Sequence, residues 1–283
     1  INIKVLNSFA FLALFSLSAY AEMEMNAIES VTIVGSKDDL AGAASVVSNE
    51  DLEKMIDTDI QKILTAVPGV YMRTEEGYGL RPNISIRGTA IERSGKVTIM
   101  EDGVLVAPSP YTSSAAYYFP TTGRIHAVEV LKGPAVISQG PQTIGGAINL
   151  ISTPIPEATS GRIVQELDDN GMSRTHAYYG GTQGNFGALL EVHEHASDGF
   201  DSIANVGGDT GFDKSDLLFK ARYESGSHSV TWKMVDLDET SNQSYVGLSQ
   251  ASFDANPRMR YGATKYDTMM NDGEQSSLTY VGD

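Results

Sequence analysis

The chain has 283 residues, of which 41% are hydrophobic and 20% are charged, a balance typical of a folded protein. Its 36 acidic and 20 basic residues give a net charge of −16, which argues against nucleic acid as a partner because phosphate binding needs a basic surface. The chain contains no cysteine, so disulfides, cysteine nucleophiles, zinc fingers and iron–sulfur clusters are excluded.

The first 21 residues are predicted to be a secretory signal peptide. Lys4 precedes a short apolar run, and Ala19-Tyr20-Ala21 then gives a small-residue cleavage pattern. The run is too short to span a bilayer as a helix, and a buried N-terminal helix is the alternative. The mature chain is therefore expected in the periplasm, in the outer membrane or outside the cell.

Residues 37–156 are predicted to form a small α+β domain. The segment Ser48–Asp51 resembles a capping box, and the apolar residues at positions 60, 63, 64 and 67 form one helix face that ends at Pro68. Asp102-Gly103 is a two-residue turn signal between two strands. The expected strands are Ile84–Arg87, Val97–Met100, Val104–Val106, Ile125–Leu131 and Ala147–Ser152.

Residues 157–283 are predicted to form a series of antiparallel strands. The connections between them alternate between short, as at Gly180–Asn185, and long and polar, as at Ala196–Asp216. This alternation is typical of an outer-membrane barrel, although a soluble β-sandwich gives a similar pattern. The expected strands are Arg162–Leu167, Ser173–Tyr179, Phe186–His195, Leu217–Tyr223 and Ser229–Leu237, with another beginning at Ser276.

Glu191, His193 and His195 alternate along one predicted strand and therefore share a face. Such a trio suits a divalent metal, but a polar stripe facing the lumen of a barrel is the preferred interpretation, so no metal site and no cofactor are expected. The chain has no catalytic Ser-His-Asp arrangement and no nucleotide-binding glycine motif, so an enzyme is not expected.

Four blocks in the first half of the chain together resemble the plug domain of TonB-dependent outer-membrane receptors. They are Ile84–Gly88, Met100–Val104, Val128–Pro134 and Gly140–Asn149. The segments Arg81–Gly88, Ala107–Tyr111 and Tyr117–Pro120 look most like the ferric dicitrate receptor branch. The resemblance covers roughly residues 28–156, and the later strands are similar only in texture.

The resemblance implies an α+β plug domain followed by the first antiparallel strands of a transmembrane β-barrel of about 22 strands. The part after residue 156 is too short for such a barrel, so we expect the sequence to hold only its beginning. The implied segments are a signal peptide at 1–21, a TonB-box segment at 22–36, the plug domain at 37–156 and the start of the barrel at 157–283.

The resemblance also assigns roles in coupling. The expected TonB box, which would bind the periplasmic energy-coupling protein TonB as an added strand, is Glu29, Ser30, Val31, Thr32, Ile33 and Val34. A plain first strand is the alternative for this segment. The expected contacts that lock the plug to the barrel are Arg87, Glu129 and Lys132, because a buried arginine needs carboxylate partners; an ordinary surface arginine is the alternative.

The expected ligand is an anionic ferric chelate, either ferric citrate or another siderophore. Arginine suits carboxylate oxygens, and tyrosine supplies rigid contact area and a hydroxyl. The candidate ligand residues are Tyr78, Arg81, Tyr111, Thr112, Tyr117 and Tyr118. The implied function is TonB-dependent uptake of this iron chelate by a receptor in the lipid of the outer membrane. The alternatives are a receptor for cobalamin or haem, a passive small barrel or adhesin, and a secreted β-rich enzyme.

Overall fold

The structure is a computed structural model that describes residues 43–55, 59–75, 77–106, 118–133, 143–168 and 171–282. All of these residues belong to one compact unit, Val34–Asp283. The predicted signal peptide and the predicted TonB box, Glu29–Val34, lie outside the described residues, as do Tyr111, Thr112 and Tyr117.

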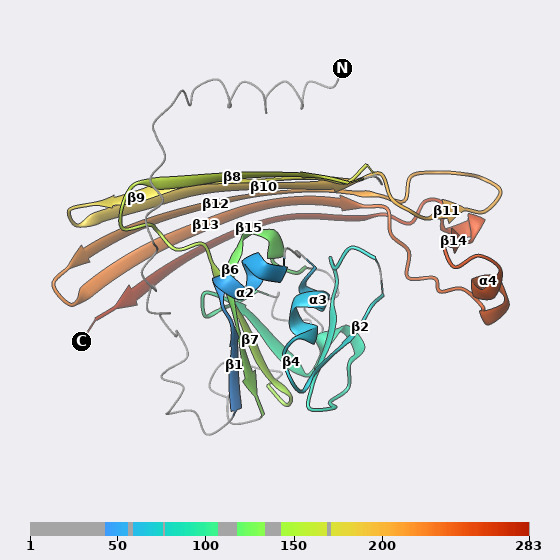
Figure 1. Ribbon diagram of the computed structural model, residues 1–283, viewed down its shortest axis with the longest axis horizontal. Helices are drawn as coiled ribbons and strands as arrows, with labels where there is room; N and C mark the ends of the chain where they lie inside the picture. The colour runs from blue at the N-terminus through green and yellow to red at the C-terminus, as the bar shows by residue number, and fades with distance from the viewer. Residues whose placement is uncertain are drawn as a thin grey trace, which may run out of the picture. The chain divides into compact units, whose positions relative to one another are not determined.

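The N-terminal part of this unit combines short helices with a mixed sheet (Figure 1). Its five-stranded sheet has the order β1-β6-β7-β4-β5, and β2 and β3 form a separate pair. In the larger sheet β4 and β7 run parallel, while the other neighbours are antiparallel. The elements are β1 (Ala43–Val47), α2 (Asn49–Met55), α3 (Ile60–Thr65), β2 (Val70–Arg73), β3 (Asn83–Ile86), the 3₁₀ turn η1 (Glu92–Ser94), β4 (Val97–Glu101), β5 (Val104–Leu105), the 3₁₀ turn η3 (Thr122–Arg124), β6 (Ile125–Lys132) and β7 (Gly146–Ser152).

Local sequence signals set the ends of these elements. Ser48 Oγ accepts a hydrogen bond from the Asp51 backbone N–H at 3.2 Å, and Asp51 Oδ2 accepts one from the Ser48 N–H at 3.1 Å, so the predicted capping box begins α2. Asp59 caps α3 by accepting from the Gln61 N–H at 2.8 Å. Asp102 and Gly103 both have positive φ, which is the backbone that a tight β4–β5 turn requires.

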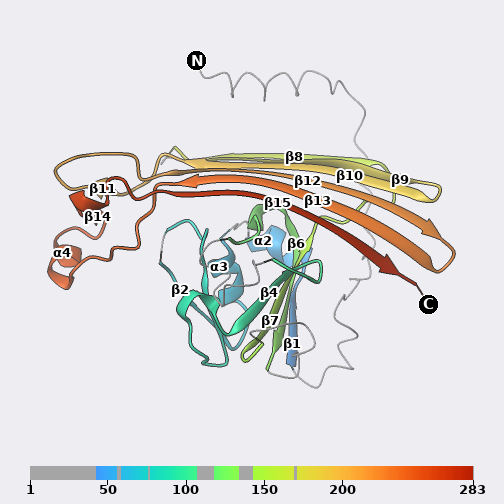
Figure 2. The same cartoon turned by 180° about the vertical axis from the view of Figure 1, so that it is seen from behind.

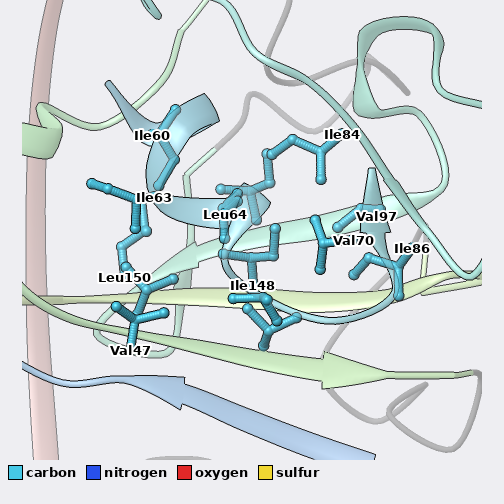
Figure 3. Packing of buried hydrophobic residues seen from close by; sticks show 14 of the residues in the cluster. Val47, Ile60, Ile63, Leu64, Val70, Ile84, Ile86, Val97, Ile148 and Leu150 are labelled. Atoms are coloured by element: carbon cyan, nitrogen blue, oxygen red, sulfur yellow. The ribbon is translucent and has the colours of Figure 1, made fainter. Parts of the chain in front are cut away.

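The core of this domain lies between α3 and the sheet (Figure 3). Ile60, Ile63 and Leu64 project from one face of α3, and each is at most 1% exposed. They pack in one cluster with Ile148 and Leu150 of β7, both of which are fully buried. The apolar spacing seen in the sequence therefore directs α3 onto the sheet.

The C-terminal part is a six-stranded antiparallel sheet in the order β15-β13-β12-β10-β9-β8. Figure 2 shows its long strands from behind. The strands are β8 (Ser160–Leu167), β9 (Ser173–Gln183), β10 (Phe186–Ser197), β12 (Phe212–Ser225), β13 (His228–Ser241) and β15 (Met269–Val281). The connections carry β11 (Ser202–Ile203), α4 (Gln250–Ala255), β14 (Met259–Arg260) and the 3₁₀ turn η5 (Gly262–Thr264).

The two ends of this sheet differ. Only residues 184–185 and 226–227 join strands at one end, which we call the turn end. Residues 198–211 and 242–268 join strands at the other, the loop end, where β11 and β14 pair in parallel. The expected alternation of short and long connections is therefore present. β12 begins five residues before its predicted start and β13 ends four residues after its predicted end, so both strands reach further toward the loop end than expected.

The outward face of the sheet carries exposed apolar side chains, whereas the inward face mixes buried charged residues with buried apolar ones such as Leu189 and Leu218. Leu190, Phe219 and Met234 are register partners on the outward face, and Leu190 is 40% exposed. The inward face carries charged residues, such as Glu191 and Asp216, that are at most 3% exposed. An apolar outside and a polar inside are typical of a sheet that faces lipid. Among the described helices, none has the length and apolar character needed to cross a membrane.

Candidate functional site

Arg124 connects the N-terminal domain to the six-stranded sheet. It ends η3, and its side chain is fully buried. Its Nη1 and Nη2 donate to the two carboxylate oxygens of Glu101 at 2.6 and 3.3 Å, and its Nε donates to Asp216 Oδ1 on β12 at 2.9 Å. One guanidinium thus bridges β4 of the domain and β12 of the sheet.

Two lysines of the sheet complete this network. Lys233 on β13 donates to Glu101 Oε1 at 2.6 Å and to Asp102 Oδ2 at 2.7 Å. Lys220 on β12 donates to the Thr153 carbonyl oxygen at 2.9 Å, and its Nζ lies 3.6 Å from Asp102 Oδ2. Three carboxylates and three cations therefore neutralise one another, and we call these six residues the docking network: Glu101, Asp102, Arg124, Asp216, Lys220 and Lys233.

The charges within the network fix its ionisation. Burial raises the pKa of Glu101, but the positive charges of Arg124 and Lys233 outweigh burial, so its pKa lies below the ordinary value. Burial likewise raises the pKa of Asp102, but Lys220 and Lys233 lower it further than burial raises it. Both carboxyl groups are therefore ionised at neutral pH, as the pairing requires.

Side chains alternate between the two faces of a strand, and this alternation turns Asp216 and Lys220 of the docking network toward the domain. Lys214, Asp216 and Lys220 occupy alternate positions of β12 and are all buried on the inward face. The adjoining segment of the domain lies close to the same face, because a Cβ built on Gly123 would lie only 2.1 Å from His193 Nε2 on β10. Lys214 Nζ also donates to the Phe119 carbonyl oxygen at 3.2 Å. A larger residue at position 123 would therefore have to displace the buried His193 ring.

A second contact between domain and sheet lies near the loop end. Arg81 pairs with Glu239 of β13 and donates to Ser241 Oγ at 3.1 Å. Tyr78 lies with its ring centroid 5.2 Å from that of Phe200 and 4.7 Å from that of Phe212. Tyr78 and Arg81, two of the six predicted ligand residues, therefore contact the sheet or its loops. Their role in ligand binding stays a prediction.

The predicted locking residues have their described contacts inside the N-terminal domain. Glu129 accepts from Asn149 Nδ2 at 2.9 Å, and Lys132 donates to Ser45 Oγ at 2.8 Å. Arg87 has a φ of 54° and lies beside Gly133. The described ion pairs with the sheet come instead from Arg81, from the docking network and from Glu53 of α2, which accepts from Arg162 Nη1 on β8 at 2.6 Å. The locking role of Arg87, Glu129 and Lys132 therefore stays a prediction.

Tyr118 is half-buried, and burial, followed by the charge of Glu101, raises the pKa of its hydroxyl. It therefore stays protonated beside the docking network. Sequence reasoning did not identify Arg124, Lys220 or Lys233 as functional residues. The signal that was available is the alternation of charged residues along β12, which marks a polar inward face.

Glu191, His193 and His195 do share the inward face of β10, as the alternation predicts. Glu191 Oε1 accepts from Thr153 Oγ1 at 2.7 Å and lies 2.6 Å from His176 Nε2, which connects it to the domain and to β9. Within the part of the chain that the structure describes, no group of three or more histidine and acidic side chains is arranged to hold a metal ion.

The N-terminal domain is held by buried ion pairs against the inward face of the antiparallel sheet, the arrangement expected of a plug and the first wall strands of a plugged barrel. Residues 36–147 match the TonB-dependent Receptor Plug Domain family. This part of the chain is a TonB-dependent receptor plug domain, and the antiparallel strands that follow match the N-terminal part of these receptors. The expected fold is thereby confirmed.

Individual relatives agree with this assignment. The chain is 25% identical over 243 residues to the vitamin B12 transporter BtuB of Photobacterium profundum, an alignment that covers 79% of this chain and 38% of the relative. It is similar to the unliganded ferric citrate transporter FecA, with a TM-score of 0.70 and 24% identity over 86% of this chain and 37% of that one. It is also similar to the ferric yersiniabactin uptake receptor FyuA from Yersinia pestis, with a TM-score of 0.59 and 19% identity over 71% and 32%. The chain thus spans less than two fifths of each relative's length.

Proposed function

We propose that this chain is the N-terminal part of an outer-membrane receptor that takes up a scarce ferric chelate from outside the cell. The plug closes the barrel, the ligand binds at the loop end, and TonB pulls on the segment Glu29–Val34 so that the plug rearranges. No covalent bond is made or broken. The observation that carries the proposal is the docking network, because a plug held by charge pairs inside a wall of strands fits a gate that is closed until force is applied.

The membrane location is supported by the outward face of the sheet. Tyr179, Leu190 and Trp232 are all at least 40% exposed there. Burying such side chains in lipid is favourable, whereas exposing them to water is costly. The loop end is proposed to face outward, because barrels of this type have short periplasmic turns and longer extracellular loops.

Ferric citrate is the proposed ligand, and two observations support it. The plug segments around Arg81 and Tyr117 resemble the ferric dicitrate branch, and the similarity to FecA covers most of the chain. A corrinoid is the second candidate, because a relative that shares 25% identity is a vitamin B12 transporter. Haem, other siderophores and a passive barrel remain alternatives with less support.

Deleting Glu29–Val34 in the complete gene tests the proposal. We expect growth on limiting ferric citrate to be lost while ferric citrate still binds to whole cells. Unchanged growth would remove the proposed coupling to TonB. Binding of a panel of radiolabelled chelates and of cyanocobalamin to the same cells identifies the ligand.

A further inference from the structure

The plug presents one arginine at its loop end that differs from its neighbours. Arg73 pairs with Glu92 at 3.3 Å, and Arg81 pairs with Glu239. Arg93 makes no ion pair among the described residues, and its guanidinium carbon lies 5.2 Å from the ring centroid of Tyr245, over the ring. Tyr245 belongs to the connection 242–268 and is 50% exposed.

The backbone around Arg93 is held in an unusual conformation. Arg93 and Ser94 have φ values of 51° and 56°, which side chains other than glycine rarely adopt. Fully buried Asn83 accepts a hydrogen bond from the Arg93 N–H at 2.7 Å, and Ser94 Oγ bonds the Pro82 carbonyl oxygen and the Ile84 N–H, each at 2.9 Å. Two adjacent strained residues, each fixed by specific hydrogen bonds, point to a position selected for function rather than for stability.

Stacking on an aromatic ring leaves an arginine ready to bind an anion. The guanidinium carbon of Arg93 lies over the Tyr245 ring, and the five N–H donors of a guanidinium lie in its own plane. Tyr245 also lines a small pocket together with Glu75, Arg81 and Gln243. Arg93 is half-buried beside this pocket. Water screens the attraction between its guanidinium and an anion less there than it would on an open surface.

We propose that Arg93 is a specificity residue that selects an oxyanion-bearing ligand, such as a carboxylate chelate, over a neutral one. Tyr245 holds the guanidinium of Arg93 in place, and two N–H groups of that guanidinium donate parallel hydrogen bonds to a carboxylate of the ligand. This inference rests on the proposed function and names the charge of the ligand that the receptor accepts.

The test uses the complete receptor in outer membranes, with radiolabelled ferric dicitrate as the anionic probe and cyanocobalamin as the neutral one. We expect Arg93→Gln to weaken ferric dicitrate binding about tenfold or more, because bonds to charged groups are the strong ones. Arg93→Lys keeps the charge but not the fork, and it is expected to fall between Arg93→Gln and the wild type. Arg73→Gln, which removes an exposed ion pair at the same end of the plug, is the matched control and is expected to stay within about threefold of the wild type.

Arg93→Gly separates a binding role from a structural one. Glycine relieves the positive φ, so this variant is expected to unfold at the same temperature as the wild type or at a higher one, yet to lose ferric dicitrate binding as Arg93→Gln does. Equal ferric dicitrate affinity in the wild type, Arg93→Gln and Arg93→Gly would overturn the assignment and leave the proposed function intact. A wild-type receptor that binds cyanocobalamin and no ferric chelate would overturn both.

Discussion

Replacing Arg124 with methionine is expected to loosen the plug by about 3–5 kcal/mol, the cost of removing one partner from a buried ion pair. The structure assigns most of this cost to Asp216. Glu101 keeps its 2.6 Å bond to Lys233, whereas Asp216, at 3% exposure, loses the 2.9 Å bond that Arg124 donates. Among the described residues, Asp216 Oδ2 has no hydrogen-bond partner, so the variant would leave a buried carboxylate without its described hydrogen bond.

The assay is urea unfolding of the plug inside the complete receptor, followed by a fluorophore on Ala66→Cys. Ala66 is exposed in the described chain, and none of the 283 residues is a cysteine that would compete for the label. A double-mutant cycle with Asp216→Asn isolates the pair, because the neutral amide no longer needs Arg124. We expect the two changes to be non-additive by about 1–3 kcal/mol. Additive effects, or a loss below about 1 kcal/mol for Arg124→Met, would refute the docking network as the contact that holds the plug.

Three further predictions concern the close approach at Gly123, the core of the domain and the charges of the docking network. Gly123→Ala should lower the urea midpoint of the plug, because its Cβ would lie 2.1 Å from His193 Nε2, and adding His193→Ala should restore part of the loss; no loss would contradict the close approach. Ile148→Ala should destabilise the plug by about 2–5 kcal/mol in the same assay, since Ile148 is fully buried, and a cost below about 1 kcal/mol would argue against the core described above. The pKa values of Glu101 and Asp102 are lowered in the folded protein, so the stabilisation from these two carboxylates is complete above their unfolded pKa values, near pH 4, and is lost as the pH falls through the lowered values. The urea midpoint should therefore show no loss from these groups between pH 5 and 8. A steep loss in that range would show that other groups control docking.

The sequence alone determined the local structure of this protein. Apolar residues at helical spacing place Ile60, Ile63 and Leu64 on one face of α3, and Asp102-Gly103 supplies the backbone of a tight turn. The short turns and long connections of the second half predict an antiparallel sheet, and alternation predicts that Glu191 and His193 share a face. These signals act within about ten residues, where the period of a helix or strand fixes direction.

Only the tertiary structure decided which charges meet. Arg124 and Asp216 are 92 positions apart, and Lys233 reaches Glu101 across 132 positions. No local pattern distinguishes Arg124 from Arg87, whose backbone lies in the left-handed region and whose side chain lies beside Gly133. In the same way, no local pattern distinguishes Arg81 from Arg93. A buried charge is stable only beside its partners, and the partners of an arginine in the plug lie on strands whose position depends on the folded wall. Whether an arginine holds the plug or remains available for a ligand is therefore a property of the assembled fold.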